Sequence, residues 1–284
     1  KGEDVLHWAE RIQGSLEGDD SPELAATVQY LMGSGKSYMP RALTEADEHY
    51  AAATRLAGEH RLASEIAIQS WFGWGNLSLR RGDFELARKK FRETMTLARA
   101  TGDIYFEALS YNNQAYAALL AGDLPDARTT IETGIDFVIR NELMRPRQYR
   151  YTTRGEIALA AGELDEAERA LTVAHDEARV YDNFTHAANI QANLGRVALA
   201  RGEHARAEAR LLDAYAAVPD AGATHLRIQI ELWLTRLYLA REDIPAARRY
   251  LETARRALAG SGRAALQAEA DALAAAVAVQ REEA

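Results

Sequence analysis

The chain has 284 residues, a formal net charge of −8 and no cysteine. The lack of cysteine excludes disulfides and thiolate metal sites, and the acidic charge disfavours direct nucleic-acid binding, which needs a basic face. The longest apolar stretch, residues 272–279, is far too short to span a bilayer, and the first residues carry no signal-peptide pattern. We therefore expect a cytoplasmic protein that does not contact membranes.

The first 60 residues predict irregular helices. One helix is expected near residues 3–16, and Ser21-Pro22 opens the next, because serine caps a helix well and proline is tolerated in its first turn. The pattern then predicts a helix pair near residues 22–38 and 43–58.

Part of this region ends like a phosphate-binding loop. The segment runs from Gly33 to Ser37 and contains Lys36, but the pattern requires a glycine where Tyr30 stands, and no strand precedes it. A distorted helix is therefore favoured over a nucleotide site.

From residue 61 to residue 260 the chain repeats itself every 40 residues. The clearest part is a box of a glycine, an acid and, four residues after the acid, an alanine. Four copies begin at Gly82, Gly122, Gly162 and Gly202, and a fifth begins at Glu242, where the glycine is lost. A fixed period of this length is typical of a solenoid of stacked units.

Each repeat predicts a helix, a turn and a second helix. Apolar columns recur at helical spacing on both sides of the box. They are Leu77, Ala117, Ile157, Val197, Leu237; Leu79, Leu119, Leu159, Leu199, Leu239; and Phe91, Ile131, Leu171, Leu211, Leu251. The glycine suits a left-handed residue after the first helix, and the acid suits the cap of the second. We expect an all-α chain of about 14 helices.

These residues resemble tetratricopeptide (TPR) repeats. The consensus spacing is met by Trp71, Trp74, Gly75, Gly82, Ala87 and Phe91, and two later repeats keep Gly155 and Gly195 with Ala167 and Ala207. The 40-residue period resembles the extended repeats of MalT-like bacterial regulators and of kinesin light chains. The resemblance covers roughly residues 22–280 and implies a right-handed α-solenoid of helix-turn-helix pairs. The last repeat departs from the pattern, with Thr235 and Glu242 in place of glycines.

We predict one solenoid over residues 1–284, with irregular helices and a first pair over 1–60, five regular repeats over 61–260 and a terminal helix over 261–284. The chain begins without methionine, and its end repeats the charge pattern of residues 241–243. Both features favour a piece of a larger protein.

One face of the first helices does not keep its residue type. The resemblance implies that this face lines a concave groove where peptides bind, and its variation indicates a solvent-facing surface, although an ordinary wet helix face is the alternative. Its three columns are Gln69, Leu109, Tyr149, Asn189, Gln229; Phe72, Asn112, Thr152, Ala192, Leu232; and Asn76, Tyr116, Glu156, Arg196, Arg236. The candidate groove residues are Asn76, Asn112, Tyr116, Tyr149, Glu156, Asn189, Arg196 and Arg236.

Two arginines give this face a local positive charge. Arg196 and Arg236 stand on adjacent repeats, and guanidinium forks suit carboxylate or phosphate groups. We expect them to bind an acidic peptide or a small anion, with Tyr116 and Tyr149 offering apolar contact. The alternative is that both arginines pair with neighbouring acids and only tie repeats together.

No catalytic, cofactor or metal constellation stands out. The seven histidines lack metal-ligand spacing, and the one local cluster, His175-Asp176-Glu177 near His186, is better read as a solvated turn. The aromatic group Trp71, Phe72 and Trp74 is better read as core, with Phe72 the most open. We therefore predict a non-enzymatic scaffold that binds a protein, a peptide or a small ligand. The favoured role is the sensor region of a bacterial signalling or transcription-regulatory protein, and the alternative is a free-standing adaptor.

Overall fold

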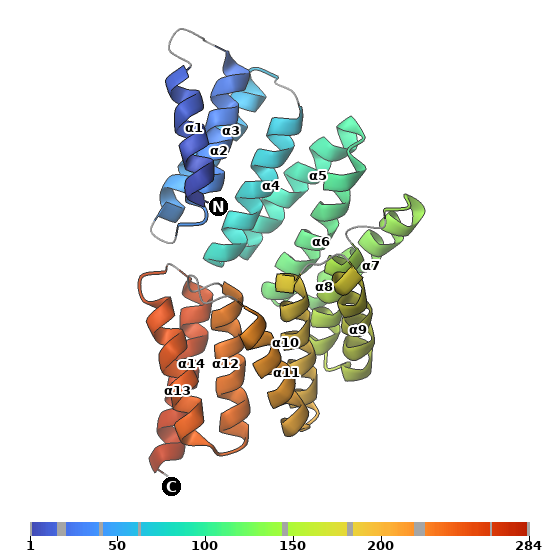
Figure 1. Ribbon diagram of the computed structural model, residues 1–284. Coiled ribbons are helices and arrows are strands. Elements are labelled where there is room, and N and C mark those ends of the chain that lie inside the picture. The colour runs from blue at the N-terminus through green and yellow to red at the C-terminus, as the bar shows by residue number, and fades with distance from the viewer. Residues whose placement is uncertain are drawn as a thin grey trace. The chain divides into compact units, whose positions relative to one another are not determined.

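The computed structural model describes the chain except for residues 1, 16–20, 40–41, 62–63, 144–146, 181–183, 219–224, 262 and 283–284. Every regular element within these limits is an α-helix, and fourteen helices are described (Figure 1). The helices fall into two compact units, an N-terminal unit, Lys1–Leu143, and a C-terminal unit, Met144–Ala284. The expected all-α class and helix number are confirmed.

The N-terminal unit holds seven helices. They are α1 (Gly2–Ser15), α2 (Pro22–Lys36), α3 (Leu43–Glu59), α4 (Ser64–Arg81), α5 (Phe84–Thr101), α6 (Ile104–Leu120) and α7 (Leu124–Arg140). Each packs on the next in the chain, and α4 also contacts α2 and α6. The first helices of neighbouring repeats therefore lie side by side.

The C-terminal unit continues the same pattern. Its helices are α8 (Arg147–Ala160), α9 (Leu164–Val180), α10 (Phe184–Ala200), α11 (His204–Ala217), α12 (His225–Ala240), α13 (Ile244–Leu258) and α14 (Ala264–Glu282). Here α10 contacts both α8 and α12, and α12 contacts α14. Stacked helix pairs of this kind make an α-solenoid, while a single solenoid over all 284 residues stays a prediction.

The turn inside each repeat has the backbone that the box predicts. The four box glycines take φ values between 75° and 87°, and Glu242 keeps the left-handed conformation at φ 60° without a glycine. The acid caps the next helix at Asp123 and Asp243, whose carboxylates accept backbone N–H bonds. The expected side-chain cap is wrong at Asp83 and Glu203, which form ion pairs with Arg81 and Arg206 instead.

The repeat columns form the core. The alanines of the box and the columns of Leu77 and Phe91 are buried in every repeat, whereas the column of Leu79 is only half-buried. The first-helix glycines allow close packing: a Cβ at Gly75 would lie 2.6 Å from a ring carbon of Phe91, and one at Gly195 would lie 2.8 Å from Leu211 Cγ. Glycine is therefore required for the close approach of the paired helices at these two crossings.

The last repeat packs without its glycine. Thr235 is fully buried in α12, and its hydroxyl donates to the carbonyl oxygen of Glu231 at 2.8 Å. Beyond it, α14 buries one stripe, made of Leu266, Ala270, Leu273 and Val277. The terminal helix is thus covered along one side, as expected for the end of a solenoid.

The segment that resembles a phosphate-binding loop is helical. Residues 33–36 form the end of α2, and Gly33 and Gly35 are buried. A Cβ at Gly33 would touch the ring of Tyr50, and one at Gly35 would lie 2.6 Å from Leu6 Cγ. These glycines make room for neighbouring side chains, and their N–H groups belong to a helix rather than to a phosphate-binding turn.

Turn residues predict connections between repeats at residues 141–146, 181–183, 219–224 and 260–262, and all four reach beyond the described residues. Residues 181–183 and 219–224 lie outside the described residues, as do parts of 141–146 and 260–262. Within the described chain, no helix is long and apolar enough to cross a bilayer.

Candidate ligand-binding face

A chain of polar contacts joins the first helices of the C-terminal unit. Asn193 on α10 donates from Nδ2 to Glu156 Oε1 on α8 at 2.7 Å, and its Oδ1 accepts a bond from Arg196 Nη1 at 2.7 Å. Asn193 is fully buried, while Glu156 and Arg196 are partly exposed. The amide therefore holds an acid and a base in fixed positions on one face, which we call the first-helix face.

Arg196 is also held by an aromatic ring. Its guanidinium carbon lies 4.8 Å from the ring centroid of Trp233 on α12, and Trp233 is only 8 % exposed. A guanidinium over an indole gains cation–π attraction. Arg196 is thus positioned from two sides, by an amide of its own helix and by a ring of the next first helix.

Glu156 titrates in an unusual setting. Burial raises the pKa of the Glu156 carboxyl, and the positive charge of Arg196 and the bond from Asn193 act in the opposite direction. Burial disfavours a charged carboxylate unless donors and a cation offset the loss of water.

Arg236 behaves differently from Arg196. Its Nε and Nη2 both donate to Glu269 Oε1 on α14, at 3.2 and 3.0 Å. For Arg236 the structure therefore shows the alternative that the sequence left open, a tie between repeats. The two arginines are not an equivalent pair.

The other predicted groove residues of this unit lie on α8 and α10. Tyr149 is 38 % exposed, and its ring centroid lies 4.4 Å from that of His186. Burial lowers the pKa of His186 to about 4. Asn189 is partly exposed, so it remains a candidate for ligand contact.

The second predicted column is not a solvent-facing surface in this unit. Thr152, Ala192 and Leu232 are all buried. Because α10 contacts both α8 and α12, neighbouring first helices cover part of one another's surface, and these positions of the second column are on the covered part. The expectation of an open face was wrong for these three positions.

The N-terminal unit carries a neutral version of the same chain. Asn113 on α6 donates from Nδ2 to Asn76 Oδ1 on α4 at 3.0 Å, and its Oδ1 accepts a bond from Asn112 at 3.1 Å. Tyr116, the third predicted residue of this unit, is half-buried on α6. The structure brings Asn76 and Asn112 together through a residue that the prediction omitted.

Sequence reasoning missed the connecting column. Asn113 and Asn193 stand 80 residues apart, in one column of the repeat, and Trp233 follows 40 residues later. The column starts one residue after the predicted second column. A search for asparagines two periods apart would have found it.

The aromatic group of α4 is part of the packing. Trp71 and Trp74 stack with ring centroids 5.3 Å apart, and Trp74 Nε1 donates to Asp47 Oδ1 at 2.7 Å. Phe72 packs against the rings of Phe91 and Phe106 and is partly buried, as both tryptophans are. The three aromatic side chains therefore take part in packing, and the greater openness of Phe72 stays a prediction.

A buried lysine lies beside this group. Lys90 is 2 % exposed, donates from Nζ to Ser78 Oγ at 2.9 Å and lies 3.7 Å from the ring centroid of Trp74. Burial lowers the pKa of Lys90 to about 8. A serine beside a lysine can act in nucleophilic catalysis, but Ser78 is 1 % exposed and its hydroxyl donates to the carbonyl oxygen of Trp74. No substrate can reach this pair.

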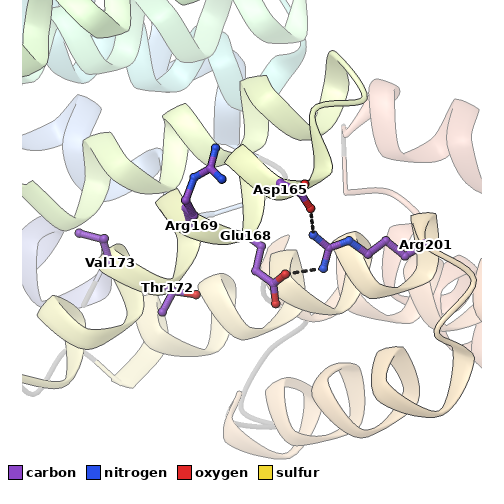
Figure 2. Close-up of a pocket in the computed structure, with 6 residues that line it drawn as sticks. All are labelled: Asp165, Glu168, Arg169, Thr172, Val173 and Arg201. Atoms are coloured by element: carbon purple, nitrogen blue, oxygen red, sulfur yellow. Dashed lines mark hydrogen bonds and ion pairs between the residues drawn. The ribbon is translucent and has the colours of Figure 1, made fainter.

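A hollow of about 550 Å³ lies elsewhere, on α9 and the end of α10. Figure 2 shows Arg201 reaching from one side to Asp165 and Glu168. The remaining lining residues are Arg169, Thr172 and Val173. Arg169 pairs with Glu166 one turn away at 2.7 Å. The charges of this hollow already neutralise one another, so it is a weaker candidate than the first-helix face.

Metal binding finds no support in the described chain, where no group of three or more histidines and acids could hold an ion. His175 lies 3.8 Å from Asp176, and His186 contacts Tyr149 and Thr152.

Comparison with known proteins gives the fold. No family model matches the chain, and no curated protein matches its sequence. Many solved structures match its fold. NprR in complex with its cognate peptide NprX matches 99 % of this chain and 83 % of its own, at 17 % identity and a TM-score of 0.73.

Two further solved structures with the same fold belong to proteins of other kinds. A tetratricopeptide repeat protein from Parabacteroides merdae matches 95 % of this chain and 93 % of its own, at 13 % identity and a TM-score of 0.66. Aspartyl phosphate phosphatase F from Bacillus subtilis matches 90 % of this chain and 68 % of its own, at 14 % identity and a TM-score of 0.66. At these identities the matches show a TPR-like fold, and this fold is shared by a peptide-bound protein and a phosphatase.

Proposed function

We propose that this chain is a peptide-binding TPR module and that the first-helix face of the C-terminal unit is its binding surface. The observation that carries the proposal is the polar chain of Glu156, Asn193 and Arg196. Its two ends are partly exposed, and its centre is a buried amide bonded on both sides. A core would be filled by apolar side chains at lower cost, since each buried polar group must find a partner. Charged groups held this way suit recognition.

A peptide is the ligand that this face suits best. Extended peptides present unpaired N–H and C=O groups, and a carboxamide offers both a donor and an acceptor to them. Asn189 and Gln229 are partly exposed carboxamides in one column of adjacent repeats. The match to NprR in complex with a peptide supports this choice of ligand class.

The biological setting follows from the same reasoning. A peptide-binding module of stacked repeats fits the sensor region of a bacterial regulator in the cytoplasm, similar to the MalT-like proteins. A free-standing adaptor would instead recognise a folded protein. We propose no catalysis, because the pair of Ser78 and Lys90 is inaccessible and the charges of the hollow on α9 pair with one another.

The test is a binding selection with linear peptides. The 284-residue chain is immobilised and incubated with a synthetic mixture of random octapeptides, and retained peptides are identified by mass spectrometry. We expect a subset to be enriched over a heat-denatured control, and the Asn189→Ala/Gln229→Ala variant to retain less of it. An Arg169→Ala variant changes an exposed residue of a second helix and should retain the same subset.

Two results would contradict the proposal. The first is the absence of enrichment over the denatured control. The second is equal retention by the wild type and by the Asn189→Ala/Gln229→Ala variant, which would place peptide binding on another surface.

A further inference from the structure

We propose that Arg196 is the specificity residue of this face and binds a carboxylate group of the peptide. The inference rests on the proposed function, because it names the chemical group that the peptide must carry. It assigns this role to Arg196 alone and not to Arg236.

The first argument is positioning. One guanidinium N–H of Arg196 is fixed by Asn193 Oδ1, and the group lies over the ring of Trp233. Asn193 is itself fixed by Glu156. An arginine that is already ordered loses little side-chain freedom on binding, so more of the gain from its hydrogen bonds appears as affinity.

The second argument is the charge that remains available. Across the described chain, no carboxylate forms an ion pair with Arg196, whereas the guanidinium of Arg236 has Glu269. Arginine has five N–H donors, of which Asn193 takes one. The others suit a carboxylate, which accepts two parallel N–H bonds from a guanidinium.

The third argument concerns Glu156. Burial raises the pKa of its carboxyl, and the positive charge of Arg196 acts against this rise. Asn193 Nδ2 donates to Glu156 Oε1 while Asn193 Oδ1 accepts from Arg196, so the amide lies between the two charged groups. Glu156 thus orients the amide without occupying the guanidinium. It also repels an incoming anion, so its charge lowers the affinity that Arg196 could otherwise give.

The carboxylate can come from the C-terminus of a peptide or from an aspartate or glutamate side chain. Three pools of N-acetylated octapeptides separate these sources. The neutral pool has an amidated C-terminus and no acidic residue. The side-chain pool is amidated and has one acidic residue at any position. The terminal pool has a free C-terminal carboxylate and no acidic residue.

Each pool is incubated at pH 7 with the immobilised full chain, and retention is measured by mass spectrometry. We expect the wild type to retain one carboxylate pool at least about tenfold better than the neutral pool, which corresponds to about 1.4 kcal/mol. The preferred pool identifies the source. Arg196→Ala should reduce that pool to the neutral level and leave the neutral pool unchanged.

Three variants make the result specific. Arg236→Ala removes the same charge from the adjacent repeat and should reduce the preferred pool by about threefold or less, because Glu269 already neutralises Arg236. Glu156→Gln keeps an acceptor for Asn193 and removes the repelling charge, so it should raise retention of the preferred pool by at least about twofold. Arg169→Ala should have no effect. Circular dichroism confirms that each variant is folded.

The outcomes separate this inference from the proposed function. Equal retention of all three pools would overturn the role of Arg196 and leave peptide binding standing. Equal losses in Arg196→Ala and Arg236→Ala, or unchanged retention in Glu156→Gln, would also overturn it. Retention of none of the pools would overturn both proposals.

Discussion

In the N-terminal unit, Asn113 links the first helices by donating to Asn76 and accepting from Asn112. In the C-terminal unit, Asn193 occupies the same column and makes the same two kinds of bond, but its partners are Glu156 and Arg196. These two repeats thus share the connecting amide and differ in the charge at its ends. Because an amide has a donor and an acceptor, it can join two neutral groups or an acid and a base with no change of backbone.

On the second helices, the two units also differ in the sign of the charge at one repeat position. Arg88 in the N-terminal unit pairs with Asp126 of the next repeat at 2.7 Å. The same column holds Glu168 in the C-terminal unit, and there the cation is Arg201 of the next repeat. Both units tie neighbouring repeats at this place with opposite polarity. Packing columns are therefore fixed by the repeat, whereas polar columns can vary as long as partners vary together.

The largest expected difference between the units is the loss of stability when alanine replaces a glycine at a helix crossing. Gly75→Ala would place a Cβ against the rigid ring of Phe91, and Gly195→Ala would place one against Leu211, which can change rotamer. Overpacking costs about 1–3 kcal/mol, and we expect Gly75→Ala at the upper end and Gly195→Ala at the lower end. Urea unfolding followed by circular dichroism measures both.

Gly58→Ala is the matched control, because a Cβ there meets nothing within 4 Å and alanine gains about 1 kcal/mol of helix propensity. Equal losses of unfolding free energy in Gly75→Ala and Gly195→Ala would show that Phe91 and Leu211 move aside equally well.

The next effect is the pH dependence of the buried lysine in the N-terminal unit. Burial lowers the pKa of Lys90 from 10.5 to about 8, so between these values the unfolded chain binds more protons than the folded chain. Stability therefore rises with pH across this window. Relative to Lys90→Met, the wild type should gain up to about 3 kcal/mol from pH 8 to pH 10.5.

The measurement is urea unfolding at several pH values, with Lys89→Met as the control for loss of an exposed lysine from the same helix. Parallel profiles of the wild type and Lys90→Met would mean that Lys90 stays fully charged in the folded chain.

In the C-terminal unit, Glu231 should give a pH dependence of stability with the opposite sign. This acid is 2 % exposed on α12 and accepts a bond from the Tyr215 hydroxyl at 3.1 Å, while Oε2 has no hydrogen-bond partner among the described residues. Burial raises the pKa of Glu231, so the stability it contributes is present below the unfolded pKa near 4.5 and is lost as pH rises through the folded pKa.

Glu231→Gln removes this dependence and should be more stable than the wild type by about 1 kcal/mol at pH 7, with the difference closing toward pH 4.5. Thermal melts at both pH values measure it. A variant that is less stable than the wild type at pH 7 would show that the carboxylate is well compensated.

The smallest effect concerns the ties on the second helices. Arg88→Ala and Arg201→Ala should each lower the melting temperature by less than any change above. Salt should reduce the difference, because the acidic partners Asp126 and Asp165 are solvent-exposed. Arg169→Ala, which breaks a pair within one helix, is the control. A loss that persists in high salt would mean that the ties act through packing rather than charge.

The repeat made the helices and their packing predictable. The 40-residue period places the residues in the columns of Ala87 and Phe91 in the same surroundings in every repeat. Each copy is therefore buried in the same way, and the apolar pattern can be recognised from the sequence alone. The left-handed turns were predictable for a related reason. They depend on local backbone sterics, and Glu242 adopts the same turn because its neighbours still form the flanking helices.

The candidate site was predictable only in part. The sequence alone identified the face and two ends of its polar chain, Glu156 and Arg196, because these columns depart from the apolar pattern. The tertiary structure decided the rest. It joined Glu156 to Arg196 through Asn193 and paired Arg236 with Glu269. It also buried Ala192 and Leu232 between adjacent first helices. An aligned column of the repeat shows which residue types recur at one position. Whether such a side chain is exposed, paired or buried depends on neighbouring helices, which lie 30 to 40 residues away along the chain.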